Sequence, residues 1–130
     1  MARPIARKDG ICFAFPDLRK TPIPPGGTPP MPYPNVAQLA DAVGASADVR
    51  AGGKPVILED SSIGSSSGGE PGSAGPVSQP NSEDCIFTTA SGTVLVNGKG
   101  VVRQGDQTEQ DKGNAKGSVM VGFPSVLVGD

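Results

Sequence analysis

The sequence predicts a small all-β domain of short hairpins and long irregular loops rich in glycine and proline, with at most one short helix. Among its 130 residues, 19 are glycine and 14 are proline. In a helix interior a glycine costs about 1 kcal/mol and a proline about 3 kcal/mol relative to alanine, so helices cannot dominate. With four phenylalanines, one tyrosine and no tryptophan, the apolar residues are mostly Val, Ile, Leu and Ala. Such a core is thin and β-branched, which favours strands.

The first 34 residues divide into three predicted segments. Residues 1–10 are polar and are predicted to form a solvated tail, while residues 11–130 form a single domain, since a chain of this length allows no second one. The apolar run at 11–15 predicts a buried strand that ends before Pro16. Residues 16–34 hold eight prolines, which exclude interior sheet pairing. We favour a rigid surface strap for this segment over an SH3-type ligand.

Two further segments have weaker patterns. Within residues 35–44, apolar side chains recur at helical spacing between Asn35 and Gly44, which predicts a short helix of two turns. Residues 61–82 contain only Ile63 and Val77 as sizeable apolar residues, so they cannot bury a core of their own. We predict that this segment is mobile in the free chain and forms an ordered, irregular strap in the assembled protein.

The remaining segments are similar to one another. Residues 49–58 align with residues 94–103 at a constant offset of 45, and both predict a strand, a Gly-Lys turn and a strand. In the second copy the turn is Asn97-Gly98, the strongest short-range hairpin signal, because both residues tolerate positive φ. Residues 125–130 end the chain and are similar to residues 93–98. These repeats indicate a compact unit with little helix.

Charge and composition exclude several function classes. The net charge is −2 and no long basic run is present, which argues against nucleic-acid binding. The chain has no histidine, so it cannot assemble a Ser-His-Asp or Cys-His centre, and we predict that it is not an enzyme. The carboxylate pairs Glu59-Asp60 and Glu83-Asp84 are typical of solvated turns. We find no signal peptide and no apolar stretch of membrane-spanning length, and expect synthesis in the cytoplasm.

Several motifs, taken in order, resemble the PAAR-repeat and PAAR-like proteins. Residues 89–106 resemble the core motif of that group, with Val102-Arg103 ending the name-giving tetrapeptide, of which only the arginine is kept. The motif residues at and after the turn are Asn97, Gly98, Lys99, Arg103, Gly105 and Asp106. The N-terminal half is similar to the PAAR-like branch in its Phe15-Pro16-Asp17, Lys20-Thr21-Pro22 and Tyr33-Pro34-Asn35 segments, followed by Gly53-Lys54-Pro55 and the Gly-Glu-Pro-Gly run at 69–72.

The resemblance implies a fold and a role. It implies a small compact cone that caps the trimeric spike of a contractile injection system, such as a type VI secretion system or a phage-tail-like particle. The chain would then be a monomer bound to a trimer, ejected on contraction, with its apex touching the target membrane transiently. Alternatives are an adaptor that attaches a toxin effector to the spike, and a secreted β-rich binding domain.

Many relatives bind zinc or iron through histidines, and this chain departs from them at that position. Relatives often continue Leu-Thr-Thr-His after Gly105-Asp106, where this chain has residues 107–110, Gln-Thr-Glu-Gln. We therefore predict no metal and no cofactor. Cys12 and Cys85 remain open to three interpretations: buried free thiols, one disulfide, or two ligands of a different metal site. The first two are favoured, because structural zinc sites take four ligands from Cys and His.

A chain that meets a trimer alone must present three similar surfaces, which the repeated valine-rich hairpins can approximate by internal pseudo-symmetry. We predict that four strand valines form the docking surface, since alternation along a strand puts each pair on one face: Val94, Val96, Val126 and Val128. The alternative, which we weigh equally, is that these valines belong to the core.

Overall fold

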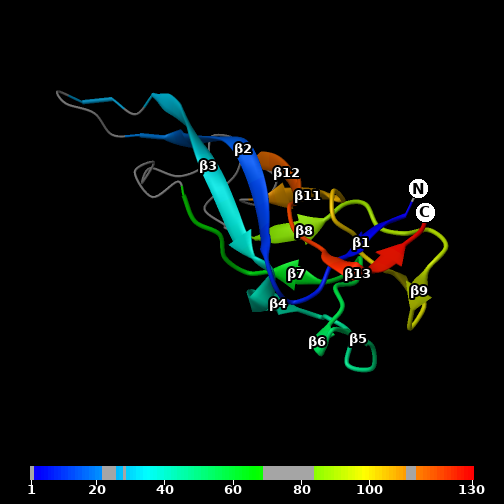
Figure 1. The fold of residues 1–130 in the computed structure, drawn as a ribbon. Coiled ribbons are helices and arrows are strands. Elements are labelled where there is room, and N and C mark those ends of the chain that lie inside the picture. Colours follow the sequence, from blue (N-terminus) through cyan, green and yellow to red (C-terminus); the bar gives the residue numbers. More distant parts are fainter. Residues whose placement is uncertain (1, 22–25, 28, 69–83, 111–113) are drawn as a thin grey trace.

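The computed structural model describes residues 2–21, 26–27, 29–68, 84–110 and 114–130, and the all-β prediction is confirmed (Figure 1). Regular helix within these ranges is limited to one 3-10 turn, η1 (Leu39–Asp41). The strands, in chain order, are β1 (Arg3–Ile5), β2 (Ile11–Lys20), β3 (Pro30–Gln38), β4 (Ala42–Val43), β5 (Arg50–Ala51), β6 (Lys54–Pro55), β7 (Ser62–Ile63), β8 (Cys85–Phe87), β9 (Leu95–Val96), β10 (Lys99–Gly100), β11 (Gln107–Gln110), β12 (Ala115–Val119) and β13 (Phe123–Val128).

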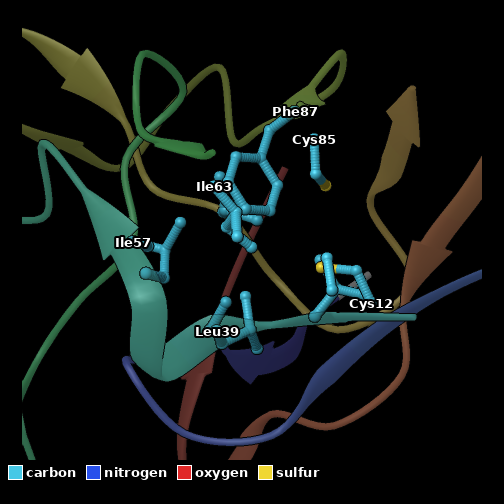
Figure 2. Close-up of a cluster of buried hydrophobic side chains, with 11 residues drawn as sticks. Cys12, Leu39, Ile57, Ile63, Cys85 and Phe87 are labelled. Atoms are coloured by element: carbon cyan, nitrogen blue, oxygen red, sulfur yellow. The ribbon is translucent and has the colours of Figure 1, made fainter. Parts of the chain in front are cut away.

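The largest sheet has seven strands and curls back on itself. Its order is β3-β2-β12-β11-β8-β7-β4, and every neighbouring pair is antiparallel. The two outermost strands, β3 and β4, are separated in the chain only by η1, so the ends of the sheet must approach each other. A bridge between Val36 and Ser67 brings them together further. Apolar side chains fill the space inside, among them Cys12, Leu39, Ile57, Ile63, Cys85 and Phe87 (Figure 2).

The described parts of the proline-rich segment belong to both strands of a long hairpin, β2 and β3, so the prediction of an unpaired surface strap is wrong. β2 continues through Pro16 and pairs with β3 as far as Lys20, with an irregular register between Ala14 and Asp17. Every second position at the start of β3 is a proline: Pro30, Pro32 and Pro34. The backbone N–H groups that these residues lack would all lie on the same edge of the strand. The other edge pairs with β2, and β3 ends the sheet, where proline is tolerated.

The predicted helix at residues 35–44 is also wrong. Asn35, Val36 and Ala37 pair with β2, and only residues 39–41 turn helically before β4 begins. Two helical turns are marginal in isolation, and the pairing with β2 offers a better alternative for the same backbone. Of residues 61–82, the described part contains β7 and the Ser67 bridge, while the prediction for residues 69–82 lies outside the described residues.

Residues 2–10 differ from the predicted solvated tail. β1 pairs with β13 through Arg3–Val128 and Pro4–Leu127, and Ile5 and Ala6 are buried. Three residues of mixed character are too short to show a strand pattern, so the pairing depends on the distant partner strand. The N-terminal segment is therefore part of the fold.

The two predicted hairpins are confirmed. β5–β6 and β9–β10 have the same boundaries after the 45-residue shift and the same register. In the second hairpin Asn97 has φ 54° and Gly98 has φ 78°, the two positive values that a type I′ turn requires. The two hairpins and the β1–β13 pair lie at one end of the molecule, and β2–β3 projects from the other (Figure 1).

Candidate functional site

Three short segments meet around an axis of pseudo-threefold symmetry. They are residues 5–7, 56–58 and 101–103, which we call the axis segments. The backbone N–H of Ile57 donates to the carbonyl of Ala6, that of Ala6 to Val102, and that of Val102 to Ile57, at 3.0, 2.9 and 3.0 Å. Each segment thus donates to one neighbour and accepts from the other. All three central residues are fully buried.

A second ring of backbone hydrogen bonds repeats the same symmetry. Glu59 donates to the carbonyl of Gly100 at 2.9 Å, Gln104 to Pro4 at 2.8 Å, and Lys8 to Pro55 at 3.0 Å. In each of these bonds the donor is the backbone N–H of the residue that directly follows an axis segment. The acceptor is the carbonyl of the residue that directly precedes a neighbouring axis segment. The repetition therefore extends beyond the sequence similarity of the two hairpins.

The third unit of this symmetry is built from both ends of the chain. Leu127 pairs with Pro4 and Val128 with Arg3, in the register in which Leu95 pairs with Gly100 and Val96 with Lys99. The three arms around the axis are thus β5–β6, β9–β10 and β13–β1. The similarity predicted between residues 125–130 and 93–98 marks one strand of the third arm, and its other strand, β1, was missed.

Three valines occupy equivalent positions in the three arms, and we call them the valine ring. Val49 and Val94 directly precede β5 and β9, while Val126 lies within β13. Val49 is 39% exposed, Val94 is 38% exposed and Val126 is 37% exposed. Leu95 and Leu127, the next residues in two arms, are 56% and 61% exposed. An exposed apolar side chain is thus repeated at three positions around the axis.

The structure divides the four predicted docking valines into two pairs. Val94 and Val126 are exposed and belong to the valine ring. Val128 is 3% exposed and lies in a second buried cluster, and Val96 packs against that cluster. Val49 was missed, although the 45-residue offset places it on Val94. That alignment was the available signal.

The buried cluster below the valine ring follows the symmetry too. Ile5, Val56 and Val101 are one equivalent set, and Ala51, Val96 and Val128 are another. These residues hold the arms against the axis segments. The exposed ring is therefore supported by an apolar layer that repeats in the same way.

Ion pairs join each arm to the loop that follows a neighbouring axis segment. Lys54 pairs with Asp9 at 3.5 Å, Lys99 pairs with Asp60, and Arg3 pairs with Asp106 at 2.9 Å between Nη2 and Oδ1. The three basic residues occupy equivalent positions. Only the third pair has a buried member, because the Asp106 side chain is 1% exposed.

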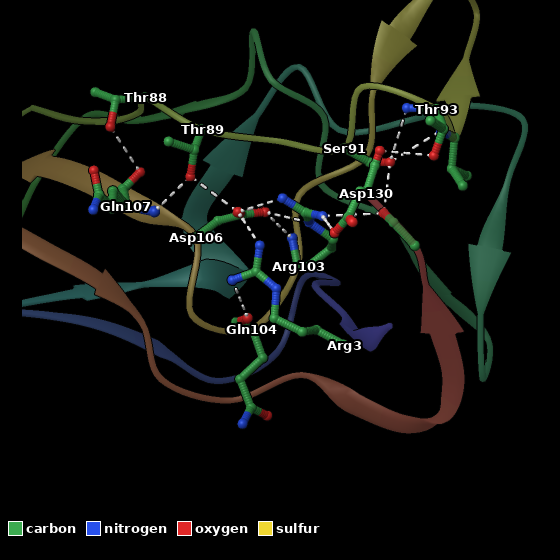
Figure 3. Close-up of polar contacts among 12 residues, drawn as sticks. Arg3, Thr88, Thr89, Ser91, Thr93, Arg103, Gln104, Asp106, Gln107 and Asp130 are labelled. Carbon is green, nitrogen blue, oxygen red and sulfur yellow. Dashed lines mark hydrogen bonds and ion pairs between the residues drawn. The ribbon is translucent and has the colours of Figure 1, made fainter. Parts of the chain in front are cut away.

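Arg103 and Asp106, two residues of the family motif, form a buried ion pair (Figure 3). Asp106 Oδ2 accepts from the Arg103 backbone N–H at 2.6 Å and from Nε at 3.0 Å, while Oδ1 accepts from Nη2 at 2.9 Å. Oδ1 also accepts from Thr89 Oγ1 at 2.9 Å. The hydrogen bond to Asp106 raises the pKa of Arg103 above its usual value. Arg103 Nη1 then donates to the Gly129 carbonyl at 3.0 Å, which ties the third arm in place.

The other predicted motif residues shape turns. Asn97 and Gly98 form the tip of β9–β10, and Asn97 Nδ2 donates to Asp48 Oδ2 at 3.0 Å. Gly105 has φ 85°, a conformation that favours glycine, at the turn between Arg103 and Asp106. Each motif residue that we named thus lies in a turn or makes a contact within the chain, and Lys99 contributes its ion pair to Asp60.

A buried polar network joins motifs that are distant in sequence. Asn35 Nδ2 donates to Asp17 Oδ2 at 3.3 Å and to Ser66 Oγ at 2.9 Å. Gln110 Nε2 donates to Asn35 Oδ1 at 2.8 Å, and Gln110 Oε1 accepts from Thr108 Oγ1 at 2.9 Å. Gln110, at the position where the resemblance implies a histidine, is therefore a fully buried amide with hydrogen-bond partners. No local pattern indicates this contact, because it depends on the curl of the sheet.

Cys12 and Cys85 are free thiols, both buried in the first core cluster (Figure 2). The pKa of the Cys12 thiol is raised far above its usual value, first by a hydrogen bond with Cys85 and second by burial. Among the described residues, no group of three or more His, Cys, Asp or Glu side chains is placed to hold a metal ion. The described part of the chain also contains no helix long and apolar enough to cross a membrane.

A pocket lies on the sheet beside β8, β11 and β12. It is lined by Thr88, Gln107, Thr108, Glu109, Lys116 and Gly117. Its two charged groups pair with each other, with Lys116 Nζ 3.1 Å from Glu109 Oε2. The pocket is separate from the three arms.

Comparison with known proteins agrees with the motifs. The search of curated proteins and the search of solved structures give no match. The family model described as Toxin PAAR-like domain matches residues 10–117, which is most of the chain and includes both hairpins. The chain therefore belongs to the Toxin PAAR-like domain family.

Proposed function

We propose that the chain is the non-enzymatic tip of a contractile injection system and caps its trimeric spike through the three arms. PAAR-like domains are associated with spike proteins and effectors, which gives the class of partner. One observation supports docking through this surface. The three valines of the ring are repeated around an axis and have nearly equal exposed fractions of 39%, 38% and 37%. A single chain makes equal contacts with three identical subunits only if its own surface repeats in this way.

The valine ring and the exposed leucines beside it, which together we call the docking face, are apolar and therefore suited to docking. The ring valines and the exposed Leu95 and Leu127 would lose water contact against an apolar partner surface, which is the main favourable term in association. The arms are held by buried cluster residues and by the Arg103–Asp106 pair. A face that is already ordered loses little conformational entropy on binding.

The opposite end of the molecule would then be at the front of the particle. With the three arms on the spike, β2–β3 points away from it (Figure 1). In this proposal the protein is made in the cytoplasm, assembles into the particle, and is ejected on contraction, so that this end meets the target membrane first and transiently. It acts mechanically and needs no metal or cofactor.

A second candidate function is an adaptor that attaches a toxin effector to the spike. The word "Toxin" in the description of the matched family favours it. Both candidates need the docking face, and they differ in whether the docked chain holds a second protein. Titration of a purified effector of the same system onto the spike–tip complex separates them.

Replacing one ring valine by aspartate tests the docking face. We expect Val49→Asp, Val94→Asp and Val126→Asp each to weaken binding to the trimeric spike by more than about tenfold, because each places an unpaired carboxylate in an apolar contact. The factors for Val94→Asp and Val126→Asp should agree within about threefold, because each of these valines is followed by an exposed leucine. Their ΔΔG values should therefore differ by less than about 0.7 kcal/mol. Isothermal titration calorimetry with purified spike protein measures them.

Val43→Asp is the matched control. Val43 is 64% exposed but lies on β4, in the seven-stranded sheet outside the arms, so binding should not change. Circular dichroism of all four variants checks that they are folded. Loss of binding in one ring variant alone, or an equal loss in the control, would contradict a threefold docking face.

A further inference from the structure

One position breaks the threefold repetition of the exposed face. The residue after each ring valine is Leu95 in one arm and Leu127 in another, but it is Arg50 in the third. All three side chains are exposed, and all three residues are paired in the same register within their arms. The face therefore has one cation where its symmetry supplies an apolar side chain.

Within the described residues, Arg50 makes few interactions. Its Nη1 donates to the Gly53 carbonyl at 3.3 Å, at the tip of its own hairpin. No ion pair within the described part of the chain joins it to a carboxylate, in contrast to Arg3, Lys54 and Lys99 of the neighbouring set. Most of the donors of the guanidinium remain free for a partner.

Docking would bring this guanidinium to an interface. A cation that loses water without a partner costs several kcal/mol, whereas a carboxylate that accepts two of its N–H groups offsets that cost and adds specificity. Since the neighbouring contacts are apolar, a partner surface that suits Arg50 needs an acidic side chain beside an apolar patch. A trimeric partner carries any such side chain three times.

We infer that the spike presents a carboxylate beside its apolar contact on each subunit, and that Arg50 pairs with one of the three. This inference rests on the proposed function. The two remaining carboxylates face Leu95 and Leu127 at the edge of the contact and stay hydrated. The chain can therefore sit on the spike in three equivalent orientations, with Arg50 on any one subunit.

Moving the arginine from arm to arm tests this inference. The probe is the recombinant trimeric spike protein of the same injection system. We expect Arg50→Leu to weaken binding about tenfold, the effect of one charge-assisted contact. The double variants Arg50→Leu/Leu95→Arg and Arg50→Leu/Leu127→Arg should each restore wild-type affinity to within about threefold.

The salt dependence gives a second readout. The wild-type affinity should fall as ionic strength rises, and the affinity of Arg50→Leu should fall less steeply. Unchanged affinity of Arg50→Leu would show that Arg50 stays in water and would overturn the inference, while the docking face would stand. If neither double variant restores the affinity, the inference that each spike subunit presents a carboxylate is wrong. Absence of wild-type binding would overturn the proposed function and the inference with it.

Discussion

Asp106→Ala is expected to lower the free energy of unfolding by about 3–5 kcal/mol, the cost of breaking a buried ion pair from one side. The carboxylate is 1% exposed and accepts hydrogen bonds from Arg103, Arg3 and Thr89. Without it, the guanidinium of Arg103, whose side chain is 7% exposed, loses its buried counter-ion. Urea denaturation followed by circular dichroism measures the change.

Asp60→Ala is the matched control for this prediction. Asp60 takes part in a similar ion pair with Lys99, but both side chains are about half exposed, at 47% and 48%. Exposed pairs contribute about 0–1 kcal/mol, so this variant should remain close to the wild type. Equal effects of the two substitutions would contradict a structural role of the buried pair.

Val128→Asp is expected to abolish folding, whereas Val126→Asp should leave a folded protein that no longer docks. The two valines lie two residues apart on β13, yet Val128 is 3% exposed within the second cluster and Val126 is 37% exposed. A carboxylate at Val128 would lose its water among the apolar side chains of the second cluster, at a cost of several kcal/mol. That is comparable to the whole stability of a small domain.

Thermal melts and binding assays on both variants distinguish these outcomes. If Val128→Asp folds but does not bind, Val128 belongs to the docking surface, as predicted from the alternation of side chains along the strand. A Val126→Asp protein that does not fold would place Val126 in the core. Either result would contradict the division of the four valines.

The parts of the fold that local chemistry determines were predictable. The turn residues of β5–β6 and β9–β10 accept positive φ, and the 45-residue offset gives the two hairpins the same boundaries and register. The similarity of residues 125–130 to the second hairpin pointed to a third arm. Its other strand, β1, could not be predicted, because residues 3–5 become a strand only by pairing with β13.

The features that the sequence did not predict have a common cause, because each depends on contacts between residues distant in the chain. The proline-rich segment was expected to lie on the surface unpaired, but its alternate prolines leave one edge free to pair with β2. The helical spacing at residues 35–44 was outweighed by pairing with the same strand. The Gln110–Asn35 contact likewise arises only when the sheet curls and joins residues 75 positions apart.

The most direct test of the account is a cryo-electron microscopy reconstruction of the tip bound to its trimeric spike, calculated without imposed symmetry. We expect one chain per trimer, with its pseudo-threefold axis on the spike axis and with Val49, Val94 and Val126 each against a different spike subunit. A chain bound off the axis, three chains per trimer, or attachment through β2–β3 would contradict the proposal that the three arms form the docking face.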